Sequence, residues 1–408
     1  MPDADDAAAG ESARLAAELA SGAVDSLPAG ALEQKLRQAR AERRQLRVKL
    51  GIDPTAPDIH LGHAVVLAKL RSFQDAGHRV VLIVGDYTAR VGDPSGRSTL
   101  RPILSVEEIE ANAATFQEQA LKILDADPER LEVRRNGEWL DMAVAELLAL
   151  LRTTTVAQLL ERDDFAKRWS AGEPISVLEL LYPLLQGYDS VAVRADVELG
   201  GTDQKFNLLL GRDVQRAYGQ DEQAIMTMPI LVGMDGSAKM SKSLGNQIGV
   251  SDAPEEMYGK TMSIPDAAMG DYYRLLLQRE PPPAQGPQAL SPRDAKRALA
   301  RELVAWLHTP EQAEAAERHF DQVFVARGVP DRVPEATFEC AGGSLHVPAL
   351  IAREFGVSRS EARRMIDQGG VSLGERALDS GEHDVPCERA DGQILKVGRR
   401  RFRRLRVR

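Results

Sequence analysis

A strand–helix–strand unit near the N-terminus constrains the fold of this chain more than any other sequence feature. Residues 47–52 form a strand-like run, and residues 79–86 contain a continuous apolar stretch typical of a strand buried on both faces of a parallel sheet. Between them the periodicity predicts a helix over residues 61–75, closed by Gly77. The sequence therefore predicts a βαβ unit within a doubly wound, Rossmann-like α/β domain, whose ligands bind at the carboxyl ends of the strands.

The length of 408 residues exceeds the roughly 250 to 300 residues at which a single hydrophobic core stops growing, so several domains are expected. The Rossmann-like catalytic domain, with two N-terminal helices, is expected at residues 1–250. A helical domain at 251–327 and a linker containing Pro and Gly at 328–342 follow. Residues 343–408 are expected to form a compact closing module.

Shorter elements are predicted inside this outline. Apolar periodicity favours helices across residues 106–160. Further strands are expected at residues 190–193 with 198–200, and at residues 228–232. No internal repeat is present.

The charge of the chain is unevenly distributed. The net charge of −9 argues against a protein that coats nucleic acid. Residues 343–408 carry 14 Arg and Lys against 9 Asp and Glu, which gives +5 and leaves −14 on residues 1–342. A basic module on an acidic body indicates that this end meets an anion, such as a phosphate backbone, although a solvated charged tail is the alternative.

The cysteine content and the absence of targeting features indicate where the chain works. Cys340 and Cys387 are the two cysteines, too few for a disulfide framework or for a cysteine-based zinc site. No stretch approaches the roughly 18 apolar residues of a membrane span, and the N-terminus is acidic. We therefore expect an untargeted protein of the reducing cytoplasm with no membrane partner.

Two histidines lie at the predicted start of the helix after the first strand. His60 and His63 are three residues apart and therefore share one helical face, beside backbone N–H groups that have no partner within the helix. Such a helix start is a natural anion site, and Gly62 leaves room for a nucleotide. Metal binding or a structural pair are alternatives, but the position directly after a strand and turn favours phosphate.

A second motif lies about 180 residues further along the chain. Lys239 and Lys242 belong to a Lys-Met-Ser-Lys-Ser segment flanked by Gly233, Gly236 and Gly245, which is typical of a mobile loop. Two lysines on such a loop can close over a triphosphate and neutralise the charge that builds as pyrophosphate departs. A solvated lysine loop is the alternative, and the histidine pair favours ATP chemistry instead.

The two motifs resemble the signature motifs of class I aminoacyl-tRNA synthetases. Residues 343–408 are similar to the S4-type RNA-binding module that ends bacterial members. Four further segments resemble tyrosyl-tRNA synthetases in particular: residues 51–56, 92–96, 182–189 and 200–204. The resemblance covers nearly the whole chain. It implies an α/β catalytic domain followed by a helical domain and a small α+β S4-type domain, and it implies a homodimer.

The resemblance places tyrosine in a pocket formed by Asp93, Tyr182, Gln186, Asp189 and Gln204. It implies that Asp189 accepts the phenol hydroxyl, while Asp93, Tyr182 and Gln186 hold the ammonium group and Gln204 lies near the carboxylate. The spacing agrees, because residues 182, 186 and 189 fall on one face of a helix. A surface acid is the alternative for Asp189.

The resemblance also implies the ATP site. Adenosine is expected near Gly51 and Gly201, with Asp203 on the ribose. The residues implied in ATP binding or catalysis are Gly51, Asp53, Thr55, His60, His63, Arg97, Arg101, Gly201, Asp203, Lys239 and Lys242. The tyrosine carboxylate attacks the α-phosphorus in line, so catalysis is positioning and charge stabilisation. Mg²⁺ is expected to bind through the phosphates, with no metal site made by the protein. The second step transfers tyrosyl to the terminal ribose of tRNA(Tyr).

Lys49 departs from the family pattern. Many members carry a tyrosine here as a second partner for the phenol. Either Asp189 recognises the hydroxyl without it, or a lysine or a water takes its place.

The basic module contains a predicted helix that is suited to RNA. Its expected N-cap is Ser358, with Glu361 three residues later, and Arg359, Arg363 and Arg364 can share an exposed face. Such a helix beside a small sheet can bind structured RNA through phosphate and shape contacts. A folded tail is the alternative.

Three other functions compete with tyrosine–tRNA ligation. Tryptophanyl-tRNA synthetases share the chemistry but normally lack the terminal RNA module. A non-catalytic RNA-binding homologue would not need His60, His63, Lys239 and Lys242 intact. A small-molecule nucleotidylyltransferase would explain the histidines but not the RNA module.

Overall fold

The computed structural model describes residues 4–55, 57–94, 104–283, 285, 289–325, 333–340, 343–374, 376–398 and 401–408. The chain divides into two compact units, Met1–Leu307 and His308–Arg408, and each is described by itself. Among the described residues, no helix has both the length and the apolar character needed to cross a membrane.

A six-stranded sheet forms the centre of the first unit. Its order is β1-β6-β5-β2-β3-β4, and all neighbours are parallel except β1 with β6. The strands are β1 Asp25–Leu27, β2 Arg47–Ile52, β3 Arg79–Val84, β4 Leu131–Arg135, β5 Val197–Gly201 and β6 Ala224–Met228. The order reverses between β2 and β5, which is the topological switch point of a doubly wound sheet. The predicted fold class is confirmed.

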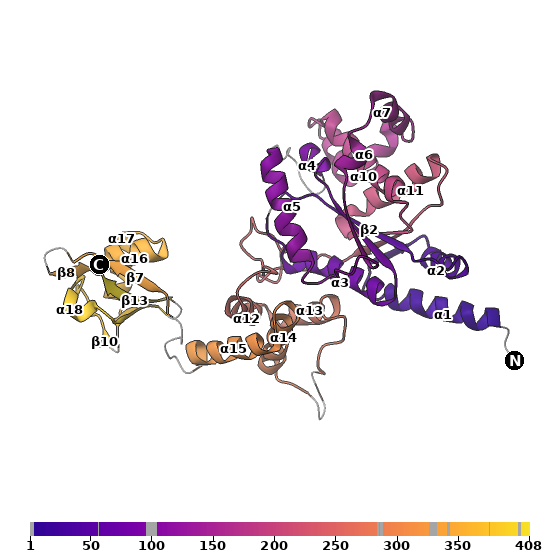
Figure 1. Cartoon of the computed structure of the whole chain (residues 1–408). Coiled ribbons are helices and arrows are strands. Elements are labelled where there is room, and N and C mark those ends of the chain that lie inside the picture. Colours follow the sequence, from indigo (N-terminus) through magenta and orange to yellow (C-terminus); the bar gives the residue numbers. More distant parts are fainter. Residues whose placement is uncertain are drawn as a thin grey trace. The chain divides into compact units, whose positions relative to one another are not determined.

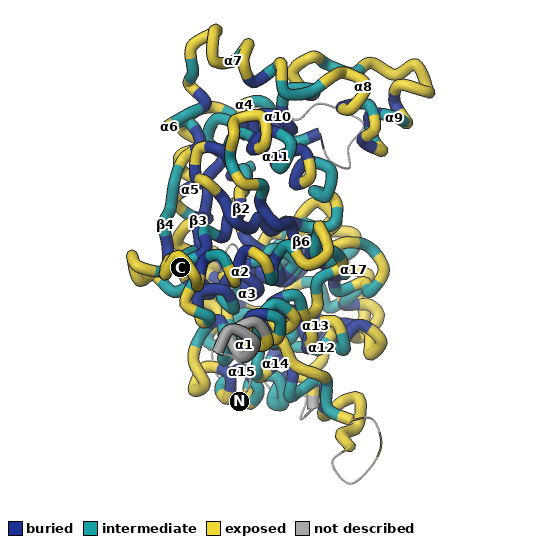
Figure 2. Tube along the Cα trace, turned by 90° about the vertical axis from the view of Figure 1, so that its right-hand side faces the viewer, coloured by how far each residue is buried: buried dark blue, intermediate teal, exposed yellow. Residues whose placement is uncertain are grey.

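Helices cover both faces of this sheet. The helices of the first unit are α1 Ala4–Leu19, α2 Ala31–Ala41, α3 Leu61–Asp75, α4 Thr88–Val91, α5 Val106–Ala120, α6 Gly137–Leu140, α7 Val144–Leu151, α8 Val156–Leu159, α9 Asp163–Ser170, α10 Val177–Val193, α11 Lys205–Ala217, α12 Pro254–Ser263, α13 Met269–Leu275 and α14 Pro292–Leu307, with short 3-10 turns at Thr202–Gln204 and Asp266–Ala268. Figure 1 shows α3 on one side of β2 and α10 with α11 on the other. In Figure 2 the central strands β2 and β3 are dark blue, whereas the edge strand β4 is mostly of intermediate burial.

Helix α3 begins and ends where the sequence predicts. Its N-cap is His60, and Leu61, Leu67 and Phe73 on its inner face are fully buried. The helix packs against β3 and β5. Burial of this apolar stripe fixes the first turn of α3, and with it the two histidines, at the carboxyl end of β2.

Helix α10 is longer than the sequence predicts. Residues 190–193, expected as a strand, are its last turn, and Arg194 closes it in the left-handed conformation with a φ of 50°. The β-branched residues there favour a strand locally, but the segment is buried where α10 packs against α11 and β2, so tertiary packing overrides the local preference. The predictions for 106–160 and 228–232 were also partly wrong, because β4 lies within the first and β6 ends at Met228.

The second unit contains a small α+β domain. Its elements are α15 Pro310–Phe320, a π-helical turn at Asp321–Val325, β7 Glu335–Phe338, β8 Ser344–His346, α16 Val347–Phe355, α17 Arg359–Asp367, β9 Val371–Leu373, β10 Arg376–Ala377, β11 Asp384–Pro386, α18 Cys387–Ala390, β12 Ile394–Val397 and β13 Arg401–Val407. A five-stranded sheet has the order β10-β9-β12-β13-β7. Residues 335–338, expected in the linker 328–342, instead form β7, because this strand pairs in parallel with β13 and buries Ala336 and Phe338.

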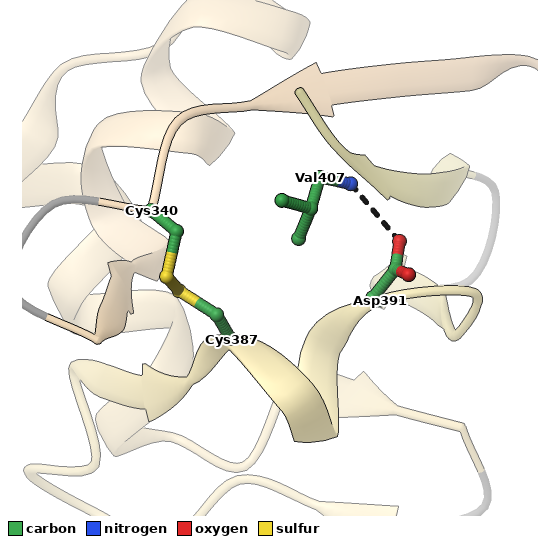
Figure 3. Close-up of a disulfide and its surroundings, with 4 residues drawn as sticks. All are labelled: Cys340, Cys387, Asp391 and Val407. Atoms are coloured by element: carbon green, nitrogen blue, oxygen red, sulfur yellow. Dashed lines mark hydrogen bonds between the residues drawn. A yellow bond between two sulfur atoms is a disulfide. The ribbon is translucent and has the colours of Figure 1, made fainter.

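A disulfide joins two distant parts of this domain. Figure 3 shows Cys340, just after β7, bonded to Cys387 at the start of α18, with an Sγ–Sγ distance of 2.07 Å. Nearby, the backbone N–H of Val407 donates to Asp391 at 2.9 Å, which ties β13 to the residue after α18. Two cysteines are too few for a framework of several bridges, and their separation of 47 residues carried no signal that they would pair.

Candidate active site

A cavity of about 370 Å³ opens at the carboxyl ends of β2 and β5. The two strands pair only at Val48 with Val197 and at Lys49 with Glu198, and beyond these residues they separate. All five residues predicted for tyrosine line the cavity: Asp93, Tyr182, Gln186, Asp189 and Gln204. The cavity therefore lies at the switch point, where doubly wound sheets bind their ligands.

Asp189 is a buried carboxylate with two fixed donors. The indole N–H of Trp139 donates to its Oδ1 at 2.8 Å, and Asn136 Nδ2 donates to its Oδ2 at 3.4 Å. Burial raises the pKa of Asp189 to about 6, while the positive charge of Lys49 and the two donors lower it. The carboxylate is therefore held in one orientation and keeps lone pairs for a further donor from the cavity.

Polar side chains also form the wall around Gln186. Asn207 Nδ2 donates to Oε1 of Gln186 at 2.9 Å and to Oε1 of Gln204 at 3.0 Å, and Gln204 donates to Asp93 Oδ2 at 2.9 Å. Arg162, which is 5% exposed, donates to Asn207 and lies 3.7 Å from Asp93. This network fixes the amide orientations and leaves the Asp93 carboxylate at the cavity surface.

Asp53 was predicted to bind ATP, but its carboxylate contacts Tyr182, one of the residues predicted to bind tyrosine. Tyr182 Oη donates to Asp53 Oδ2 at 3.0 Å, and Thr88 Oγ1 donates to Oδ1 at 2.6 Å. Asn136 donates in turn to Thr88. Burial, followed by the negative charge of Asp53, raises the pKa of Tyr182 well above its usual value, so its phenol stays protonated.

The histidine pair forms the opposite end of the cavity. The backbone N–H of His60 donates to Nδ1 of His63 at 3.3 Å, and the ring centroids are 4.0 Å apart. Since Nδ1 of His63 accepts a hydrogen bond, its proton lies on Nε2. Burial, with His63 and Lys239 nearby, lowers the pKa of His60 to about 3, and burial lowers the pKa of His63 to about 4. Both rings are therefore neutral near pH 7.

Backbone pairing brings the two sequence motifs together. The N–H of Leu61 donates to the carbonyl of Ile248 at 2.9 Å, and the N–H of Val250 donates to the carbonyl of Ile59 at 2.9 Å. Lys242 Nζ forms an ion pair with Asp58 at 2.5 Å, next to the histidines. The segment that follows the lysine loop is thereby tied to the start of α3.

Asn246 organises the lysine loop from within. Its Oδ1 accepts the N–H of Ser241 at 2.8 Å, and its Nδ2 donates to Asp235 at 2.7 Å and to the carbonyl of Lys239 at 3.2 Å. A Cβ at Gly233 would lie only 2.3 Å from Asn246, so glycine is required for this close approach. The backbone of the loop is thus anchored, while the side chains of Lys239 and Lys242 remain exposed.

Comparison with known proteins identifies the family. The family described as tRNA synthetases class I (W and Y) matches residues 41–325. The tyrosine–tRNA ligase of Moorella thermoacetica is 52% identical over 404 residues, covering 97% of this chain and 96% of the relative. The tyrosine–tRNA ligase of Thermotoga maritima is 51% identical over 382 residues, covering 91% and 93%. The chain belongs to the class I tyrosine–tRNA ligase family.

Solved structures agree on the fold. A C-terminally truncated mitochondrial tyrosyl-tRNA synthetase of Aspergillus nidulans superposes with a TM-score of 0.62 at 23% identity, covering 78% of this chain and 100% of that one. The tyrosyl-tRNA synthetase of Archaeoglobus fulgidus, in a complex with L-tyrosine, superposes with a TM-score of 0.60 at 24% identity, covering 75% of this chain and 99% of that one. At these identities the likeness is one of fold.

Most residues predicted for ATP lie around the same cavity in this synthetase. The predicted residues among its lining are Gly51, Asp53, Thr55, His60, His63, Gly201, Asp203 and Lys239. Lys242 is not among the lining residues and pairs with Asp58 instead. Arg97 and Arg101 lie outside the described residues. A Cβ at Gly62 would lie 2.9 Å from the ring of His60, so glycine lets this ring pack closely against the start of α3.

Sequence reasoning missed the residues that support the site. Asn136 and Trp139 follow β4, and Asn207 and Arg162 belong to α11 and the segment before α9. The position of Asn136 directly after a strand was a usable signal, because parallel strands end at the same edge of a sheet. Recognition of β4 would have been needed to use it.

Both active-site imidazoles are expected to remain neutral from roughly pH 5 to 8, the range in which an unperturbed histidine titrates. Burial disfavours their charged form, and the pKa values of about 3 and about 4 lie below this range. Long-range ¹H–¹⁵N spectra of the imidazole nitrogens of His60 and His63 across a pH titration measure this directly. The same chain in urea is the control, since its histidines should titrate near the ordinary value of about 6.5. Protonation of either residue in the folded protein above pH 5 would contradict the prediction.

Proposed function

We propose that this chain activates L-tyrosine with ATP to give tyrosyl-adenylate and pyrophosphate, and then transfers tyrosyl to the 3′-terminal ribose of tRNA(Tyr). One observation carries the proposal. A single cavity is lined at one end by the buried Asp189 carboxylate and at the other by His60, His63 and Lys239. The two ends suit a phenol and a triphosphate, and the family relationship supports the same reaction.

Tyrosine would bind with its hydroxyl toward Asp189. The carboxylate accepts the hydroxyl proton as a hydrogen bond, while Trp139 and Asn136 hold it in place. The ammonium group would bind Asp93, Tyr182 and Gln186 at the other end of the pocket. Phenylalanine would leave Asp189 buried without its partner, and such an unpaired group costs free energy.

ATP would bind across the switch point. Adenosine lies near Gly51 and Gly201, with Asp203 on the ribose hydroxyls. The neutral His60 and His63 donate N–H groups to the phosphates, and the backbone at the start of α3 adds further donors.

The reaction needs no protein nucleophile. The tyrosine carboxylate attacks the α-phosphorus in line, the bond to the bridging oxygen breaks, and pyrophosphate leaves with the electron pair. Lys239 and Lys242 would neutralise the charge that builds on the leaving pyrophosphate. Because Lys242 is paired with Asp58, it must exchange this partner for the phosphates when ATP binds.

Mg²⁺ would accompany ATP rather than bind to a protein cage. Within the described ranges, no group of three or more His, Cys, Asp or Glu side chains could hold a metal ion. The ion would be held mainly by the triphosphate and would neutralise part of its charge. ATP and tRNA are both cytoplasmic reactants, and we propose that compartment for the chain.

The C-terminal domain would bind the tRNA. Arg359, Arg363 and Arg364 are exposed on α17, whose N-cap Ser358 accepts the N–H of Glu361 at 3.1 Å. Three guanidinium groups on one short helix can bind phosphates of structured RNA.

We further propose a homodimer formed through α7 to α11. Exposed large apolar side chains recur there: Val144, Leu148, Val156, Trp169, Val177, Leu178, Leu209 and Tyr218. Such surfaces are typical of protein interfaces.

Tyrosine-dependent exchange of pyrophosphate into ATP tests the proposed function. Well-folded protein should catalyse exchange with tyrosine and much less with tryptophan or phenylalanine. Exchange with tryptophan alone would favour a tryptophan-specific enzyme. No exchange with any of the three amino acids would refute the proposal.

Replacement Lys242→Ala should lower the rate of tyrosine activation by about 100-fold, the usual effect of removing one donor to a developing anion. Tyrosine affinity should be nearly unchanged, because Lys242 is not part of the cavity lining. Pre-steady-state adenylate formation and equilibrium dialysis with tyrosine measure the two quantities. Lys122→Ala, at an exposed lysine that is not among the cavity-lining residues, is the matched control. Equal losses in rate and affinity would contradict the assigned role.

Combined replacement of Arg359, Arg363 and Arg364 by Ala should weaken tRNA binding and leave pyrophosphate exchange intact. If each arginine contacts one phosphate, the plot of log affinity against log salt concentration should become shallower, and the magnitude of its negative slope should decrease by about 2 to 3. Arg376→Ala is the control, because this exposed arginine is already paired with Asp379. An unchanged slope would show that α17 does not contact the phosphates.

The variant Val177→Asp should raise the dissociation constant of the dimer by at least about 100-fold, because association would bury an unpaired charge. Val177 is the most exposed residue of the apolar set, at 73%. Sedimentation velocity over a concentration series measures the change. Val24→Asp, at an exposed valine outside α7 to α11, should behave like the wild type. A wild-type chain that stays monomeric at high concentration would refute the dimer.

A further inference from the structure

Lys49 is a fully buried cation at the switch point of the sheet. It is 0% exposed and lies on β2 directly opposite Glu198 on β5, which is 1% exposed. The two side chains form an ion pair at 2.8 Å. A buried ion pair is costly unless its remaining hydrogen-bonding capacity is satisfied, so its presence requires a reason.

The hydrogen bonds of the Lys49 ammonium are fully accounted for. It donates to the backbone carbonyl of Gln186 at 3.0 Å, to Ser190 Oγ at 2.8 Å and to Glu198 Oε1 at 2.8 Å. An ammonium has three N–H donors, so none is left for a substrate hydroxyl. Lys49 is also not among the residues that line the cavity. Lys49 therefore does not bind the phenol directly.

Two of these partners lie on either side of Asp189 in the sequence of α10. Gln186 precedes it by one turn, and Ser190 follows it directly. Glu198 is held from its other side, since Ser190 Oγ donates to its Oε2 at 3.2 Å and Gln223 Nε2 also donates to it. The network thus connects β2, β5 and the C-terminal turns of α10.

We propose that Lys49 is a positioning residue for substrate selection: it binds α10 on both sides of Asp189 and supplies the positive charge that lets this buried carboxylate accept the phenol hydroxyl. The phenol hydroxyl then binds one carboxylate, that of Asp189. Many family members have a tyrosine at position 49 that contacts the phenol, whereas Lys49 lies outside the cavity lining and supports Asp189 instead. This inference rests on the proposed function.

The charged and polar groups around Asp189 act in opposite directions. Burial raises its pKa to about 6, Lys49 lowers it, Trp139 and Asn136 lower it through hydrogen bonds, and Glu198 raises it. Tyrosine binding needs the ionised carboxylate, so affinity should fall as the pH drops through this pKa. The midpoint is the pH at which half of this change in tyrosine affinity has occurred. Loss of the Lys49 charge should move this midpoint to higher pH, and loss of the Glu198 charge should move it to lower pH.

The test is the pH dependence of the tyrosine dissociation constant, measured by equilibrium dialysis on the full-length protein. Lys49→Met should raise the midpoint by about one pH unit or more, a shift typical of removing a nearby opposite charge. Glu198→Gln should lower the midpoint, and the double variant should lie between the two. Ser190→Ala is the matched control, because it removes a hydrogen-bond partner of both groups and changes no charge.

Opposite shifts in the two single variants, with an unmoved midpoint in Ser190→Ala, would support the role of Lys49. A purely structural role would lower affinity by the same factor at every pH, and a common midpoint in all variants would overturn the inference. If Lys49→Met does not fold, Glu198→Gln and the double variant still decide the direction. Absence of tyrosine-dependent exchange in the wild type would instead refute the proposed function itself.

Discussion

The reversal of strand order between β2 and β5 is the constraint on which the candidate active site depends. Only two residue pairs join these strands, and beyond them the sheet opens into the cavity. The ends of both strands therefore border the same cavity, and Gly51 on β2 and Gly201 on β5 are both among its lining residues. The helix after each strand starts at the same edge, so helix N-termini and the ends of strands supply the site together.

Electrostatics at this edge follow from burial. Burial lowers the pKa of His60 to about 3 and that of His63 to about 4, so both rings are neutral near pH 7. Asp53 accepts hydrogen bonds from Tyr182 and Thr88, and Asp189 accepts them from Trp139 and Asn136, so both carboxylates keep fixed orientations. Fixed donors and acceptors need little rearrangement when a substrate binds, which is the basis of preorganisation.

The sequence predicted those parts of the fold that local pattern determines. The strand at 47–52, the helix at 61–75 and the strand at 79–86 were found because their periodicity and caps agree with their final structure. The segments at 190–193 and 335–338 were misread, because long-range packing decided them. One joins a helix that packs on the sheet, and the other pairs with a strand more than 60 residues away.

The candidate site divides in the same way. The sequence by itself determined the chemical inventory: the two motifs and the Tyr182, Gln186 and Asp189 face, because these are patterns of residue type and spacing. Only the tertiary structure decided which groups support them, namely Trp139 behind Asp189 and Lys49 opposite Glu198. The physical reason is that hydrogen bonds and ion pairs between separate strands and helices depend on topology. Residue spacing within one segment therefore cannot predict them.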